Sequence, residues 1–432
     1  MDPIIPFSAN TDVLLAVVGS IMLLGFVAEA AFLKYRIPES LGLMLIGVLL
    51  GPVTHVVSRS QILSLEQLAP FFGAIALVVI VFGGSSKIDF RSVASGGTRG
   101  LLLGVLDTVL TVAVVTPLFY YFFHWPLLIS ALFGALLGET TATIVIPIAE
   151  RMGLDKTVFD AMTLDSTFNS VTCIVAFYIV FDAITSGFSG FLSVSRYMLE
   201  LIAVGIFVGG LAGFLWVIFL SRLKTVTHTY MVTVGVMLGL YALVDTLGGS
   251  AILSVLVFGL VVANSNILIK NTDNRLNQQE VSGLHNEITF FIRTFFYVYM
   301  GLLITPSLDS ALTGALIASI LIVPRWIGVE SASLGNRIMQ KNSGLMTALY
   351  PRGLTVAVLA GIVLNASLND PAIQPYALNM FNYAFMVILF SVVISSVMVA
   401  REYKKRTNES LYELLQTLQK LYSPAAKRQN SA

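Results

Sequence analysis

The chain contains repeated apolar runs, each long enough to cross a lipid bilayer. Residues 201–220, LIAVGIFVGGLAGFLWVIFL, form one such run without a single charged side chain. A membrane-spanning helix needs about 20 apolar residues, and a helix pairs its own main-chain polar groups inside the bilayer. Of the 432 residues, 56% are hydrophobic and only 11% are charged, whereas a soluble domain carries about 25% charged residues. The sequence therefore predicts an all-α integral membrane protein.

Charged residues and glycine or proline interrupt these runs and predict thirteen transmembrane helices. The predicted spans cover residues 12–33, 38–57, 68–86, 100–123, 126–149, 158–182, 197–221, 229–247, 250–267, 286–306, 310–334, 343–366 and 376–400. Residues 401–432 form a short tail, in which the leucine and tyrosine spacing of residues 408–422 predicts an amphipathic helix.

The distribution of basic residues predicts the orientation. Of the 25 lysines and arginines, 20 fall on the side of the C-terminus, two (Arg59 and Arg196) on the opposite side and three within spans. Cytoplasmic loops carry the excess of basic residues in membrane proteins. We therefore expect a multi-pass protein of the cell membrane with an external N-terminus and a cytoplasmic C-terminus.

Several classes of function find little support. The net charge of +1 gives no sign of a nucleic-acid partner. The one cysteine, Cys173, cannot form a disulfide within the chain, and the four histidines lie far apart in the sequence. No soluble signalling domain, channel filter or protease motif is recognisable. We expect no enzyme activity and no cofactor, with membrane lipid and transported ions as the partners.

One apolar span carries polar residues along its first half. In TLDSTFNSVTCIV, residues 163–175, Asp165 and Asn169 lie four apart on one helix face, and Ser166 and Ser170 form the adjacent stripe. Such oxygen-bearing side chains can bind a monovalent cation such as Na⁺, and the carboxylate can hold a proton when the cation leaves. The alternative is hydrogen bonding between helices, which explains the serines and asparagine better than the aspartate.

Two further spans carry helix-breaking patterns. Residues 138–147, GETTATIVIP, place Glu139, Thr140 and Thr141 a few residues before a proline, and residues 349–357, LYPRGLTVA, place Arg352 between proline and glycine. These two spans are seven apart in the predicted order and so run in opposite directions. An inverted repeat of six helices, with broken helices that cross at mid-membrane, would produce this arrangement.

The other ionisable residues within spans receive structural interpretations. Arg325 lies mid-span and needs an anion, for which Asp165 or Glu139 is the natural counter-ion. We favour a structural salt bridge over direct ion coordination for Arg325, and Arg352 could neutralise carbonyl groups at the helix break. Asp107 and Asp245 each stand alone in the sequence, and a structural role is the expectation for both.

Taken together, these segments resemble the monovalent cation:proton antiporters, specifically the prokaryotic thirteen-span sodium/proton exchangers of the NhaP type. The segments that carry the resemblance occur in the family's order and are RIPESLGLMLIGVLLGP (36–52), FGGSSKIDF (82–90), LFGALLGETTATIVIPIAERMGL (132–154), LDSTFNSVTCIV (164–175), FFIRTFFYVYMGLLI (290–304), LIVPRWIGV (321–329) and PRGLTVAVLAG (351–361).

The resemblance implies a homodimer that works by elevator-type alternating access. Its exchanger domain would cover residues 1–400, with a mobile core at about 100–182 and 310–400 and a dimer scaffold at about 12–86 and 197–306. Within the core, the resemblance makes Asp165 the acidic partner of Arg325.

The chain departs from the family pattern at two sites. The family's principal ion-carrying aspartate falls on Ser170, and the aspartate of the fifth span falls on Thr141. We hypothesise that Asp165 carries the exchange and that Glu139 substitutes sterically for one lost carboxylate. The rival hypothesis is that this chain transports differently, with an altered cation choice or stoichiometry, or has lost the activity.

The expected function is secondary antiport of a monovalent cation, Na⁺ first, for protons across the cell membrane, which serves pH homeostasis. A K⁺/H⁺ antiporter or a Kef-like potassium efflux system is the alternative, and a non-transporting membrane sensor or scaffold is a further one.

Overall fold

The computed structural model describes residues 19–20, 22–23, 25–27, 39–54, 57, 59–86, 98–185, 191–222, 229–265, 278–305 and 307–422. Within these residues the secondary structure is helical throughout, without a strand, which confirms the predicted all-α class. The helices are α2 (Glu39–Val48), the π-helix η1 (Leu49–Val53), α3 (Arg59–Ser85), α5 (Thr98–Phe122), α6 (Leu127–Leu136), α7 (Ala142–Arg151), α8 (Lys156–Thr185), α9 (Phe191–Arg222), α10 (Thr229–Thr246), α11 (Ala251–Ala263), α13 (Gln278–Leu303), α14 (Leu308–Ile320), α15 (Ile322–Ser333), α16 (Arg337–Lys341), α17 (Ser343–Ala348), α18 (Leu354–Ala366) and α19 (Gln374–Tyr422).

These helices match the predicted membrane spans. Each span from the second to the thirteenth coincides with one helix or with a pair of consecutive helices, while the first, 12–33, lies mostly outside the described residues. In the described part of the chain, six helices are long and apolar enough to cross a membrane, and five shorter apolar helices accompany them. The protein is thus a multi-pass membrane protein, and the total of thirteen spans stays a prediction.

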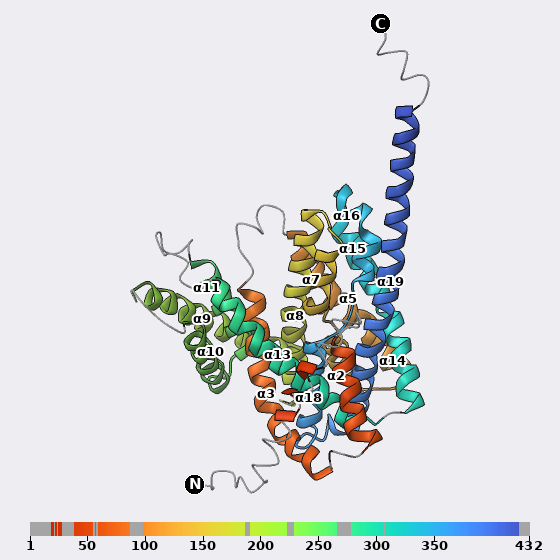
Figure 1. Ribbon diagram of the computed structural model, residues 1–432. Coiled ribbons are helices and arrows are strands. Elements are labelled where there is room, and N and C mark those ends of the chain that lie inside the picture. Colours follow the sequence, from red (N-terminus) through yellow and green to blue (C-terminus); the bar gives the residue numbers. More distant parts are fainter. Residues whose placement is uncertain are drawn as a thin grey trace, which may run out of the picture.

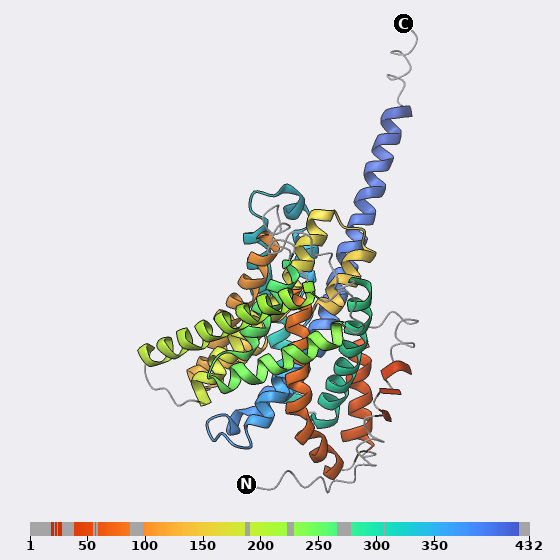
Figure 2. The same cartoon turned by 90° about the vertical axis from the view of Figure 1, so that its left-hand side faces the viewer.

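The last helix is longer than the sequence suggested. α19 continues from the predicted span into the tail and ends only at Tyr422. Residues 401–407, REYKKRT, contain neither glycine nor proline, so nothing in them terminates a helix. The helix predicted for residues 408–422 is therefore the end of α19, which projects beyond the other helices (Figures 1 and 2).

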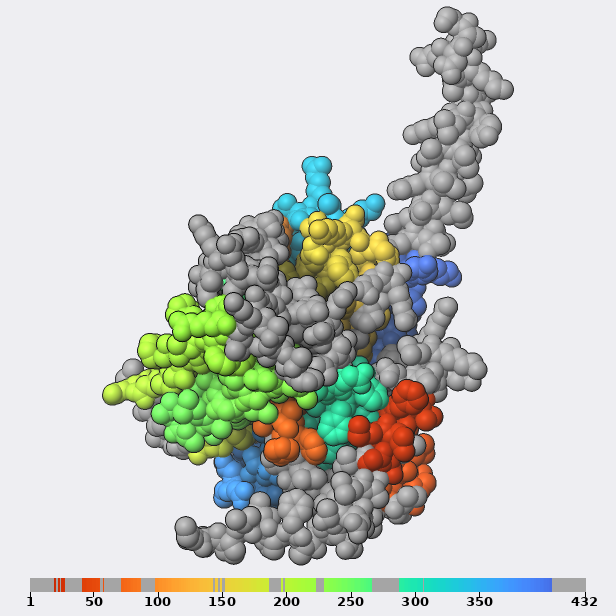
Figure 3. Space-filling view, turned by 60° about the vertical axis from the view of Figure 1, so that its left-hand side comes forward, coloured from red at the N-terminus to blue at the C-terminus, as the bar shows by residue number. Residues whose placement is uncertain are grey.

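Helices α9, α10 and α11 lie together on one side of the molecule (Figure 1). A Cβ atom on Gly209 of α9 would lie closer than any contact allows to the main-chain oxygen of Ser254 on α11, so the two helices touch through their backbones. Large apolar side chains of α9 are exposed, among them Phe207 at 71% and Leu199 at 67% exposure. Figure 3 shows this part of the chain, in yellow-green, at the surface of the molecule. Such a surface suits contact with lipid.

Glycines also bring α5 close to α8, and this contact positions the polar centre of the molecule. A Cβ atom on Gly100 would lie 2.5 Å from the main-chain oxygen of Ala161, and one on Gly104 would lie 3.1 Å from that of Asp165. One turn after Gly104, Asp107 is therefore held against the face of α8 that carries Asn169.

Two helices are broken, and their breaks meet. Residues 137–141 separate α6 from α7, residues 349–353 separate α17 from α18, and the main-chain N–H of Thr141 donates to the Pro351 oxygen at 2.9 Å. A Cβ atom on Gly353 would lie 2.5 Å from Cβ of Thr141, so only glycine fits at this crossing. The predicted broken, crossing helices are confirmed, although Pro147 lies inside α7 and the first break precedes it.

Candidate functional site

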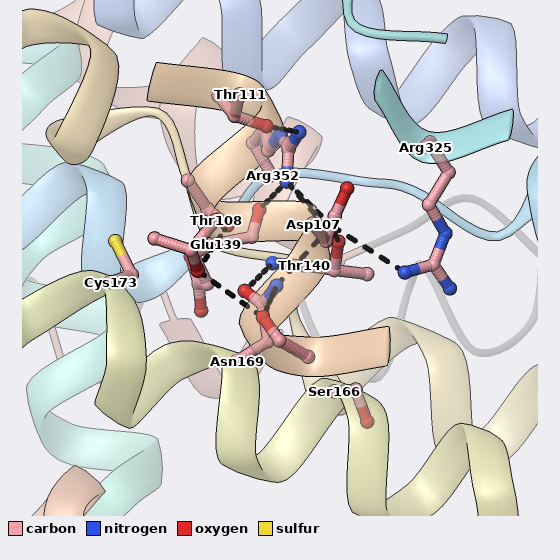
Figure 4. Close-up of polar contacts among 12 residues, drawn as sticks. Asp107, Thr108, Thr111, Glu139, Thr140, Ser166, Asn169, Cys173, Arg325 and Arg352 are labelled. Atoms are coloured by element: carbon pink, nitrogen blue, oxygen red, sulfur yellow. Dashed lines mark hydrogen bonds and ion pairs between the residues drawn. The ribbon is translucent and has the colours of Figure 1, made fainter. Parts of the chain in front are cut away.

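Asp107 of α5 lies at the centre of the polar cluster where the two breaks meet (Figure 4). Its Oδ2 atom accepts hydrogen bonds from Oγ1 of Thr140 at 2.7 Å and from Nδ2 of Asn169 at 3.3 Å. The same oxygen lies 3.5 Å from Nη1 of Arg325 and 3.5 Å from Nη1 of Arg352. The prediction that Asp107 stands alone is therefore wrong, because its partners come from four other segments of the chain.

Arg325 of α15 forms its shorter ion pair with Asp165 of α8. Its Nη2 atom lies 2.6 Å from Oδ2 of Asp165, and both side chains are fully buried. Its Nε atom donates to the main-chain oxygen of Met346 at 3.2 Å. Of the two counter-ions considered for Arg325, the structure has Asp165, and the second carboxylate within reach is Asp107 rather than Glu139.

Arg352 lies in the break before α18 and points into the other break. Its Nη1 atom donates to the main-chain oxygen of Glu139 and to Oγ1 of Thr140, the latter at 3.2 Å. Its Nη2 atom donates to Oγ1 of Thr111 at 3.5 Å. The guanidinium thus stabilises a carbonyl group that the interrupted helix leaves without an intrahelical partner, a role suggested by its sequence position.

The carboxylate of Glu139 points toward the start of α18. Its Oε1 atom accepts hydrogen bonds from Oγ1 of Thr355 at 2.8 Å and Oγ of Ser170 at 3.3 Å. Its Oε2 atom accepts from the main-chain N–H groups of Gly353 at 3.2 Å and Val356 at 3.4 Å. A carboxylate at a helix N-terminus pairs free N–H groups and interacts favourably with the helix dipole.

The remaining predicted residues divide into two groups. Oδ1 of Asn169 accepts from the Thr140 N–H at 2.8 Å, and its Nδ2 atom donates to the Gly104 oxygen at 3.1 Å, so Asn169 joins the cluster. Thr141 joins it through its main chain at the crossing. The hydroxyl of Ser166 instead bonds the Thr163 oxygen within α8, and Figure 4 shows this side chain pointing away from the cluster.

The helix arrangement and the buried charges at two crossing breaks correspond to a known family. A family profile described as "Sodium/hydrogen exchanger, transmembrane" matches residues 18–402. The chain belongs to this sodium/hydrogen exchanger family. The resemblance inferred from the sequence motifs is confirmed.

Individual relatives of this exchanger include antiporters for two cations. The chain is 24% identical to "Probable Na(+)/H(+) antiporter 2" of Methanocaldococcus jannaschii, over 84% of this chain and 90% of that protein. It is 27% identical to "K(+)/H(+) antiporter NhaP2" of Shewanella sp. (strain ANA-3), over 74% of this chain but only 54% of that protein. The solved structure of the sodium proton antiporter MjNhaP1 of M. jannaschii superposes with a TM-score of 0.77 at 19% identity, over 90% of this chain and 97% of that one. The exchanger therefore has the sodium/proton antiporter fold.

Asp107, Thr111 and Thr355 belong to the cluster, although none of them was predicted as a site residue. Asp107 had a signal in Thr111, four residues later on the same helix face, together with the need of Arg352 and Arg325 for two anions. Thr355 had no signal of its own, because a threonine near the start of an apolar helix is unremarkable. Only the fold brings its hydroxyl to Glu139.

Proposed function

We propose that the protein exchanges a monovalent cation, Na⁺ as the first expectation, for protons by alternating access at the buried polar cluster. The observation that carries this proposal is a set of buried carboxylates, amide and hydroxyl groups at the meeting point of two helix breaks. Ionisable side chains inside a membrane protein mark ion pathways, and broken helices present main-chain groups to ions. Membership of the sodium/hydrogen exchanger family supports the same activity.

The location of the cluster supports the proposed division into a mobile core and a scaffold. Its side chains come from α5, α8, α15, the α6–α7 break and the α17–α18 region. All of these lie within residues 100–182 and 310–400, the predicted core. We propose that this core moves against a homodimeric scaffold, in the cell membrane, with an external N-terminus and a cytoplasmic C-terminus.

Transport measurements on the purified protein test the activity. Reconstituted in liposomes with a pH-sensitive dye inside, the protein should move protons when a gradient of Na⁺, K⁺ or Li⁺ is imposed. Liposomes without protein are the negative control. The variant Asp245→Asn is the positive control, because this exposed residue lies on α10 and belongs to none of the cluster's contacts. Cation gradients that move no protons through correctly folded protein would contradict the proposal.

A potassium/proton antiporter is the second candidate. It is supported by the Shewanella relative, although this chain spans about half of that protein. The same cation series separates the two candidates, because Na⁺ and Li⁺ should drive more proton flux than K⁺ if sodium is the substrate. A flux that follows K⁺ alone would favour the second candidate.

A further inference from the structure

The buried charges of the cluster do not cancel. Among the residues that the structure describes, five charged side chains are buried: Asp107, Glu139, Asp165, Arg325 and Arg352. Three carboxylates face two guanidiniums, so the fully ionised cluster holds one surplus negative charge. An uncompensated charge away from water is strongly unfavourable, and the surplus is removed by binding one proton or one monovalent cation.

The ion pairs identify the surplus carboxylate. Asp165 is paired with Arg325, and Asp107 lies between Arg325 and Arg352. In the described part of the chain, no lysine or arginine lies within ion-pairing distance of the Glu139 carboxylate. Glu139 is therefore the buried acid of the cluster that has no ion-pair partner among the described residues.

The two oxygens of Glu139 have different partners. Oε2 accepts only from the main-chain N–H groups of Gly353 and Val356, which anchor it to the start of α18. Oε1 faces two hydroxyls, those of Ser170 and Thr355. A hydroxyl can donate to a carboxylate or turn its lone pairs to a cation, whereas an N–H group or a guanidinium can only donate.

We propose that Glu139 Oε1, with the hydroxyl oxygens of Ser170 and Thr355, binds the exchanged cation, and that a proton on the same carboxyl group replaces it. The inference deepens the proposed antiport and rests on it. The three oxygens come from the first helix break, from α8 and from the start of α18, so movement of these segments opens or closes the site. Asp107 and Asp165 instead remain paired with their arginines and hold the cluster together.

This assignment differs from the hypothesis that Asp165 carries the exchange. The Asp165 carboxylate faces the Arg325 guanidinium at 2.6 Å, which offers no lone pair to a cation. Oδ1 of Asp165 has no hydrogen-bond partner among the described residues, but a cation there would lie beside the positively charged guanidinium of Arg325. At Glu139 a cation needs only two hydroxyls to rotate. The geometry therefore favours Glu139.

Moving the carboxylate is the sharpest test. Glu139→Gln keeps the size of the side chain and removes its charge, so cation-driven proton flux should fall at least about 100-fold. In the double variant Glu139→Gln/Ser170→Asp, the new carboxylate starts from a position whose hydroxyl is 3.3 Å from Glu139 Oε1. Flux should return to at least about a tenth of that of the wild type, which a purely structural role of Glu139 at the start of α18 does not predict.

The hydroxyl ligands give a second test that does not depend on the double variant. Thr355→Val should raise the KM for the cation about tenfold with a smaller change in kcat, because one ligand is lost and the shape is kept. Ser170→Ala should act in the same direction. The matched control is Thr172→Val. Like Ser170, Thr172 donates its hydroxyl to a carbonyl one turn earlier in α8, but it makes no hydrogen bond to Glu139.

The melting temperature of each purified variant is measured first, so that loss of transport is read only from folded protein. Lost flux in Glu139→Gln, recovery in the double variant and raised KM in Thr355→Val support the inference. Wild-type flux in Glu139→Gln, a folded double variant without flux, or an unchanged KM in Thr355→Val overturns it. Absence of exchange in the wild type would instead overturn the proposed function.

Discussion

Two sides of the buried cluster differ in the kind of partner that they give to a carboxylate. On the arginine side, formed by Asp107, Asp165, Arg325 and Arg352, acids face guanidiniums at 2.6–3.5 Å. On the hydroxyl side, formed by Glu139, Ser170 and Thr355, the acid faces groups that can both donate and accept. Burial is almost complete on both sides, so the partner decides whether a carboxylate is fixed or free to exchange its ion.

Neutralising Asp107 should produce the largest effect. Asp107→Asn leaves Arg325 and Arg352 in a buried site with one carboxylate fewer. Removing one partner of a buried pair typically costs about 3–5 kcal/mol, and we expect about 5 kcal/mol here because two guanidiniums lose a counter-ion. The measurement is the free energy of unfolding of the purified protein in detergent, together with its melting temperature.

Glu139→Gln is the comparison for this prediction. This variant breaks no ion pair among the described residues, so its melting temperature should stay closer to that of the wild type than the melting temperature of Asp107→Asn does. Asp245→Asn, at an exposed position on α10, controls for the loss of a carboxylate as such. Equal destabilisation by Glu139→Gln and Asp107→Asn would remove the distinction between the two sides.

The pair Asp165–Arg325 gives the next largest effect. Asp165→Asn should cost about 3–4 kcal/mol, because Asp107, at the longer distance of 3.5 Å, is then the one carboxylate paired with Arg325 among the described residues. Adding Arg325→Gln removes the unpaired charge. The double variant should therefore lose about 1–3 kcal/mol less unfolding free energy than the two single variants lose in sum. Unfolding free energies of all four proteins in the cycle measure this coupling, and strict additivity would contradict a tight ion pair.

The sequence predicted the broken helices and most of the cluster, but it could not predict the pairing. Glycine, proline and clustered hydroxyls mark a break locally, although the first break precedes Pro147, because Asn169, Arg352 and Pro351 pair its main-chain groups. Asp107 looked isolated because its partners lie 33 to 245 positions away along the chain. The sequence pattern of a segment shows which of its residues are polar, whereas their contacts with other segments depend on the packing of the helices.

A substitution where the two helix breaks cross should destabilise the protein less than the loss of a buried charge does. Gly353→Ala would place a Cβ atom 2.5 Å from Cβ of Thr141, and overpacking of this kind costs about 1–3 kcal/mol. Because Gly353 also donates to Oε2 of Glu139, the shift should reach the hydroxyl side and raise the KM for the cation. Adding Thr141→Gly makes room for the new methyl group, and it should restore part of the lost melting temperature and lower the KM again. Failure of that rescue would mean that the contact with Thr141 is not the cause.

The smallest effect should come from an ion pair outside the cluster. Arg196 and Glu200 on α9 lie 3.3 Å apart, one helical turn from each other, with side chains 84% and 62% exposed. An exposed pair of this kind gains little because water and salt already screen both charges. Arg196→Ala should therefore change the melting temperature by about 1 °C or less, and cation-driven proton flux should stay at the wild-type level. The distance between Arg196 and Glu200 is similar to the distances between Asp107 and its two arginines. The exposed pair and the buried pairs therefore differ mainly in burial. A loss of stability in Arg196→Ala as large as that in Asp165→Asn would show that charge pairing stabilises this protein whether or not the pair is buried.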